Sequence, residues 1–118
     1  MIPTPITLDI SPMSENKIWQ GRRFKTKAYQ TWRTHIGWLL RKKHAETVKG
    51  WVAVEVDFYI KEFKRADEMN FLKGFFDALK EGGMIEDDRF IKWHRSEKHA
   101  IRRDEQEKIT FKIIPLAI

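Results

Sequence analysis

Alternation of apolar and polar residues predicts the strands of this protein. The alternation is clearest in WVAVEVDFYI (51–60), where every second residue from Val52 to Ile60 is apolar and Glu55 and Asp57 fall between them. A strand with this pattern buries one face and leaves the other in solvent. Shorter segments at 6–10 (ITLDI), about 89–96 and about 107–114 also predict strands.

Two other segments predict amphipathic helices, because their apolar residues recur every three or four positions. The first runs from about Lys27 to Lys43, with Lys and Arg in its last turn, where they suit the helix dipole. The second runs from roughly 68 to 81, and Gly82 and Gly83 predict its end. The expected apolar stripes are Tyr29, Trp32, Ile36, Leu39 and Leu40 in the first helix and Phe71, Leu72, Phe75, Phe76 and Leu79 in the second.

The order of these elements indicates the fold class. Residues 11–27 (SPMSENKIWQGRRFKTK) have the composition of a loop, and HAIRRDEQE (99–107) predicts a charged turn between the last two strands. The order is therefore strand, helix, strand, helix, strand, strand. We expect an α+β fold in which a mixed β-sheet carries two main helices on one face, with residues 1–118 forming a single domain.

Composition narrows the class of function. The absence of cysteine excludes thiolate catalysis and cysteine zinc sites and favours a cytoplasmic location. Neither a signal peptide nor a transmembrane segment is predicted, so we expect no membrane partner. An excess of 23 Lys and Arg over 17 Asp and Glu gives a net charge of +6, which favours a polyanionic partner such as nucleic acid, although an ordinary basic surface explains the charge equally well.

Carboxylates surround the second predicted helix in ADEMNFLKGFFDALKEGGMIEDDRFI (66–91). Each has an ordinary explanation: Asp67 suits a helix N-cap, and Asp87 and Asp88 suit a polar turn. Lys73 alone would be a solvated helical lysine. Together, however, carboxylates from a helix start and from the start of the next strand can converge on a hard cation, and a lysine one turn along can hold a phosphate.

These residues, in this order, resemble the RusA family of Holliday junction resolvases. The matching segments are D67-E68-M69-N70, Lys73, D77-A78-L79 and G83-M84-I85-E86-D87-D88, preceded by P12-M13-S14-E15-N16, W19, the basic GRRFKTK and Y29-Q30-T31-W32. The resemblance covers most of the chain. It implies a small dimeric endonuclease, of a family mostly derived from phages or prophages, that makes paired nicks in four-way DNA junctions with Mg²⁺ or Mn²⁺ and needs no organic cofactor.

The resemblance also implies a catalytic site. Asp67 and Asp88 match the family's metal-binding aspartates, and Lys73 matches its active-site lysine. The family's middle aspartate falls on Met69, and a neutral thioether is a poor ligand for Mg²⁺. Three accounts follow: Glu68 or Asp87 supplies the missing oxygen, the protein binds branched DNA but cuts slowly or not at all, or Met69 is an introduced change.

Basic residues near this site are the expected DNA contacts. The candidates are Arg22, Arg23, Lys25, Lys27, Lys64, Arg65 and Lys73, together with Asn16, which could instead only shape its loop. Symmetric nicks need two sites, so we expect a two-fold homodimer. The rivals are a RusA-like protein that recognises branched DNA without cutting it and an RNA-binding module, for which the sequence has no RNP-type or KH-type signature.

Overall fold

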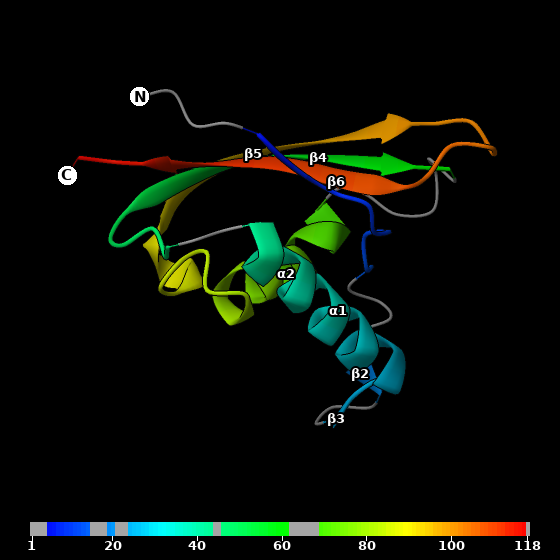
Figure 1. Cartoon of the computed structure of the whole chain (residues 1–118), viewed down its shortest axis with the longest axis horizontal. Helices are drawn as coiled ribbons and strands as arrows, with labels where there is room; N and C mark the ends of the chain where they lie inside the picture. The colour runs from blue at the N-terminus through cyan, green and yellow to red at the C-terminus, as the bar shows by residue number, and fades with distance from the viewer. Residues whose placement is uncertain (1–4, 15–18, 21–23, 44–45, 62–68, 118) are drawn as a thin grey trace.

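A computed structural model describes residues 5–14, 19–20, 24–43, 46–61 and 69–117 of the chain (Figure 1). Its larger elements follow the predicted order of strand, helix, strand, helix, strand, strand. In chain order the elements are β1 (Ile6–Leu8), β2 (Trp19–Gln20), β3 (Phe24–Lys25), α1 (Lys27–Lys43), β4 (Val52–Ile60), α2 (Met69–Glu81), the 3₁₀ turn η2 (Asp88–Phe90), β5 (Ile91–Ala100) and β6 (Lys108–Pro115).

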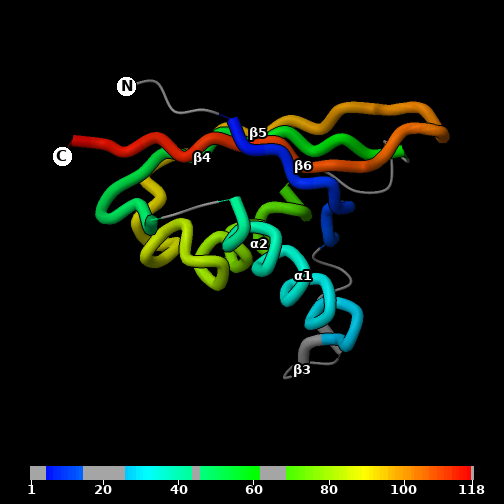
Figure 2. The backbone as a smooth tube through the Cα atoms, viewed as in Figure 1, coloured from blue at the N-terminus to red at the C-terminus, as the bar shows by residue number. Residues whose placement is uncertain are grey.

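Four strands form one mixed sheet in the order β1-β6-β4-β5. The central strand β4 pairs parallel to β5 and antiparallel to β6, and β1 pairs antiparallel to β6. The parallel pair requires a crossover, and α2 provides it. Both helices lie on the same side of the sheet, and its other face is open (Figures 1 and 2). The predicted α+β fold with two helices on one face is confirmed.

The buried side chains lie between the sheet and the helices. Every second residue of β4 from Val52 to Ile60 is buried, as the sequence predicts, and Phe58 packs against Phe71 and Phe75 of α2 with ring centroids 5.3 and 6.1 Å apart. Phe75 also meets Phe111 of β6 at 5.2 Å. Burial of these apolar side chains is the main force that holds the helices on this face. Burial of this apolar stripe also determines which side of α2 carries its polar residues.

A tight glycine turn at the end of α2 leads directly to the candidate site. Met84 N–H donates to Leu79 O at 2.9 Å and Gly83 N–H donates to Lys80 O at 3.1 Å, with Gly83 in the left-handed conformation (φ 74°). This is the Schellman pattern of helix termination. Met84 and Ile85, directly after this turn, are buried and anchor the segment to the core. Asp87 and Asp88 follow within a few residues.

Several predicted elements differ from the structure. The strand predicted at 6–10 runs only from Ile6 to Leu8. The strand predicted at about 89–96 runs from Ile91 to Ala100, because its last residues continue the parallel pairing as far as Ile60 and Ala100. The segment predicted as a loop contains the two-stranded β2–β3 sheet, in which Trp19 pairs with Lys25. Among the described helices, none has the length and apolar character needed to cross a membrane.

Candidate active site

The helix α2 presents one polar face beside its buried stripe. Met69, Lys73 and Asp77 are spaced four residues apart, so they lie along one side of the helix. Met69 begins the helix and is 59% exposed, Lys73 is exposed and Asp77 is partly buried. This arrangement places an exposed ammonium group and a partly buried carboxylate one turn apart on the same side of the helix.

The turn after α2 adds two adjacent carboxylates. Asp87 is the N-cap of η2, where Arg89 N–H donates to Asp87 Oδ1 at 3.4 Å. Lys80 of α2 forms an ion pair with Asp87, with Nζ 3.6 Å from Oδ2. The ion pair therefore links Asp87 to the helix that carries Lys73. Asp88, the next residue in the chain, lies beside the same helix.

The two aspartates are electrostatically coupled. A hydrogen bond shared with Asp87 is the main cause that raises the pKa of Asp88, and partial desolvation and the charges of Asp87 and Asp77 raise it further. The charge of Lys73 acts in the opposite direction. The same hydrogen bond, followed by that from Arg89 N–H, lowers the pKa of Asp87. The Asp88 carboxyl group is therefore the one on which two neighbouring carboxylates and one ammonium group act.

A buried tyrosine holds the third carboxylate in place. Tyr29 of α1 is fully buried, and its hydroxyl donates a hydrogen bond to Asp77 Oδ2 at 3.1 Å. Burial, followed by the charge of Asp77 and this hydrogen bond, raises the pKa of Tyr29 to about 12. The tyrosine therefore keeps its proton near neutral pH and donates it in the hydrogen bond to the Asp77 carboxylate.

The structure brings together part of the predicted site. Asp87 and Lys73 both lie close enough to Asp88 to influence its carboxyl group. Lys27 is exposed at the first position of α1, and Lys25 is in β3. The other predicted metal ligands and DNA contacts lie outside the described residues: Asp67, Glu68, Asn16, Arg22, Arg23, Lys64 and Arg65.

From the sequence alone, neither Asp77 nor Tyr29 is assigned a role in the candidate active site. Asp77 belongs to the segment D77-A78-L79, and its spacing of four residues from Lys73 is the signal in the sequence that both share a helix face. The link to Tyr29 joins residues 48 positions apart in the chain. No periodic pattern in the sequence specifies such a contact.

Most of the sequence matches one known protein family. The model of the family described as Endodeoxyribonuclease RusA matches residues 9–113, which is most of the chain and includes α2, Asp87 and Asp88. The chain belongs to the RusA family. RusA proteins are metal-dependent endodeoxyribonucleases that resolve Holliday junctions. A search of curated proteins found no match to this sequence.

The donor atoms at this RusA site suit a hard divalent cation. Asp77, Asp87 and Asp88 offer carboxylate oxygens, the ligand type that Mg²⁺ and Mn²⁺ prefer. The raised pKa of Asp88 shows that the ionised pair is costly by itself, because two adjacent negative charges repel. A divalent cation offsets that repulsion, so the residues present fit the metal that RusA nucleases require.

Proposed function

We propose that this RusA protein cleaves four-way DNA junctions by metal-dependent hydrolysis of phosphodiester bonds. The observation that carries the proposal is the exposed Asp88 carboxylate, which lies near both Asp87 and Lys73, the other residues that resemble the family's pattern. An exposed acidic site flanked by lysine is accessible to a DNA backbone. The net charge of +6 favours association with that backbone.

The proposed roles follow from the chemistry of each side chain. Asp88 would hold Mg²⁺ or Mn²⁺, with Asp67 as the second aspartate implied by the family and Asp87 or Glu68 as supplementary oxygen donors. The bound cation supplies Lewis acidity and a more acidic water. Lys73 would contact the scissile phosphate and offset the charge that develops on it. Asp88 must be ionised for its role, and Lys73 favours that state.

Asp77 is proposed to shape the field of the site. Its charge raises the pKa of Asp88, and its hydrogen bond from Tyr29 fixes its position. A divalent cation near Asp88 would therefore meet a more negative environment than Asp87 and Asp88 alone provide. This contribution partly compensates for the neutral residue at Met69.

The second candidate function is recognition of branched DNA without efficient cleavage. Met69 favours it, because the residue is 59% exposed on the same helix face as Lys73 and brings no oxygen ligand. The two candidates differ in one measurable property. A binder retains affinity for the junction and gains cleavage when Met69→Asp restores the family's carboxylate.

We further propose that the active form is a homodimer on branched DNA. A four-way junction offers pairs of equivalent strands, and two-fold symmetry would place one site on each member of a pair. The basic residues Lys25, Lys27, Lys64 and Arg65, with Arg22, Arg23 and Asn16, are the proposed phosphate contacts. Sedimentation velocity of the protein with and without a junction tests the two-to-one stoichiometry.

A cleavage assay tests the nuclease proposal. A labelled four-way junction and a linear duplex of the same sequence are incubated with the protein and Mg²⁺ or Mn²⁺. We expect metal-dependent nicking of the junction, its loss in Asp88→Asn and its retention in Asp104→Asn, which alters an exposed carboxylate in the β5–β6 turn. Equal cleavage by Asp88→Asn and the unmodified protein would refute the assigned site.

A further inference from the structure

We propose a second metal site, for a transition-metal dication such as Zn²⁺ or Co²⁺, formed by Asp57, Glu97 and His99 on the open face of the sheet. One ligand atom from each of these side chains lies within 4.8 Å of the other two. Among the described residues, no other group of three His, Asp or Glu side chains places its ligand atoms this close together. It includes an imidazole nitrogen, which distinguishes it from the all-carboxylate nuclease site.

The register of two adjacent strands creates the group. Asp57 of β4 lies directly opposite Glu97 of β5, and His99 lies two residues further along β5, on the same face. Phe58, next to Asp57, packs against Phe71 of α2, so Asp57 projects from the opposite side of the sheet. The proposed site and the candidate active site are therefore on different sides of the domain.

The two distances from His99 to the carboxylates are near those expected around a tetrahedral cation. His99 Nε2 is 2.8 Å from Asp57 Oδ1 and 3.8 Å from Glu97 Oε2. Two ligands bonded to zinc at about 2.1 Å in a tetrahedral arrangement are about 3.4 Å apart. The two observed distances lie on either side of that value, so small side-chain rotations would suffice and the backbone would not need to move.

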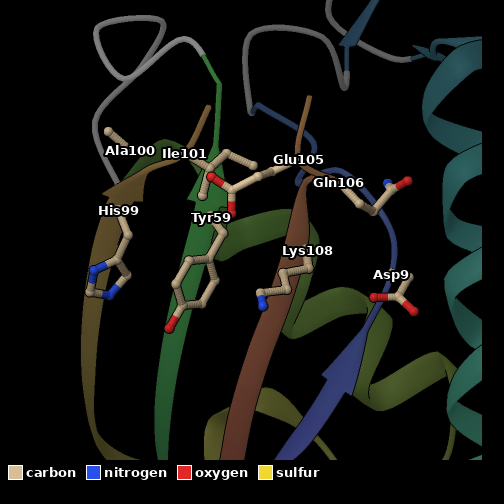
Figure 3. Close-up of a pocket in the computed structure, with 8 residues that line it drawn as sticks. All are labelled: Asp9, Tyr59, His99, Ala100, Ile101, Glu105, Gln106 and Lys108. Carbon is tan, nitrogen blue, oxygen red and sulfur yellow. The ribbon is translucent and has the colours of Figure 1, made fainter. Parts of the chain in front are cut away.

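Neighbouring contacts orient two of the three ligands before any metal binds. The His99 ring stacks on Tyr59, with centroids 4.7 Å apart and an interplanar angle of 18°. Lys108 Nζ lies 4.9 Å from the centroid of the Tyr59 ring. Figure 3 shows His99, Tyr59 and Lys108 side by side on β5, β4 and β6, with the helices behind the sheet. Glu97 is held through its other oxygen, since Arg95 Nη1 contacts Oε1 at 3.0 Å.

The charge balance favours a cation. Glu55, which is not one of the three proposed ligands, is paired with both Arg95 and Lys112, at 3.2 and 3.1 Å. The positive charges of these two side chains are therefore partly offset by Glu55. Asp57 has His99 as its contact within the described residues. Two carboxylates and one neutral imidazole would carry two negative charges to a dication and leave a coordination position for water. This ligand set suits Zn²⁺ or Co²⁺ better than Mg²⁺, because imidazole is a softer ligand than carboxylate or water.

Cobalt titration tests this site without relying on cleavage. The full-length protein carrying Asp88→Asn, which weakens the nuclease site, is titrated with CoCl₂ while the visible absorption of bound cobalt is recorded. We expect one strongly absorbing Co²⁺ per chain, displaced by Zn²⁺. His99→Gln should weaken binding at least about tenfold, since outer contacts of metal ligands already have effects of that size.

Matched variants separate loss of a ligand from loss of structure. His94→Gln alters the histidine that lies on the helix side of the same strand, near Phe76, and should leave Co²⁺ affinity unchanged. Glu97→Gln alters a side chain that is 55% exposed, so it should preserve the fold, verified by circular dichroism, and weaken Co²⁺ binding. No bound Co²⁺ at millimolar metal, or equal affinity in His99→Gln, Glu97→Gln and the parent, would overturn the proposal.

Discussion

Removing one buried hydroxyl should change the stability of this protein in a pH-dependent way. In Tyr29→Phe the ring stays in the core, but Asp77 loses the hydrogen bond that Tyr29 donates at 3.1 Å. A hydrogen bond to a charged group contributes about 1.5–3 kcal/mol to stability. We therefore expect Tyr29→Phe to lower the free energy of unfolding by about that amount near neutral pH.

The raised pKa of Tyr29 sets the direction of the pH effect. Its pKa rises from 10.0 to about 12 in the folded protein. Between these values the folded state holds a proton that the unfolded state has lost, so this contribution is complete below pH 10 and declines as pH rises toward 12. At pH 11 it has lost about 1.4 kcal/mol relative to neutral pH, which is the energy of one pKa unit.

Urea unfolding at pH 7 and pH 11 measures both effects. The stability difference between the unmodified protein and Tyr29→Phe should shrink by about 1.4 kcal/mol between the two pH values. Tyr59→Phe is the control at pH 7, because it removes the chain's other tyrosine hydroxyl while leaving the ring that stacks on His99. A difference that stays constant from pH 7 to pH 11 would refute the raised pKa of Tyr29.

Three further predictions concern packing, charge and DNA binding. Gly82→Ala should lower the free energy of unfolding by about 1–3 kcal/mol in urea titrations, because its Cβ would lie 2.8 Å from Leu40 Cδ1; unchanged stability would contradict this packing. Lys73→Met should move the acid limb of the nicking pH profile to higher pH, because Lys73 lowers the pKa of Asp88; an unmoved limb would contradict that role. Lys27→Ala should reduce the slope of log affinity against log salt by about one in junction-binding titrations, and an unchanged slope would remove Lys27 from the phosphate contacts.

The sequence predicted those elements whose pattern reflects burial on one side. Strand β4 and both helices bury the expected stripes, since apolar residues there recur at the period of the element. The extent of β5 was missed because it is an edge strand with exposed or partly exposed residues throughout. Such a strand carries no burial pattern, and only its pairing with β4 defines where it ends.

The sequence alone singles out those candidate-site residues that are close together in the chain, and their catalytic roles stay a prediction. Asp87, Asp88 and Lys73 belong to a short segment whose order matched a family motif. The contact of Tyr29 with Asp77 and the group of Asp57 with Glu97 and His99 instead depend on tertiary packing and on parallel strand register. Parallel register joins residues about 40 positions apart through a crossover helix, so sequence spacing alone does not reveal it.

Mapping the cuts on all four strands of a synthetic junction tests the central claim most directly. The unmodified protein, Met69→Asp and Asp88→Asn are compared with Mg²⁺ or Mn²⁺ at equal junction occupancy, measured in the same samples. We expect paired nicks at symmetric positions from the unmodified protein, faster nicking from Met69→Asp and none from Asp88→Asn. Junction binding with no cut from either the unmodified protein or Met69→Asp would contradict the account, as would cleavage that survives Asp88→Asn.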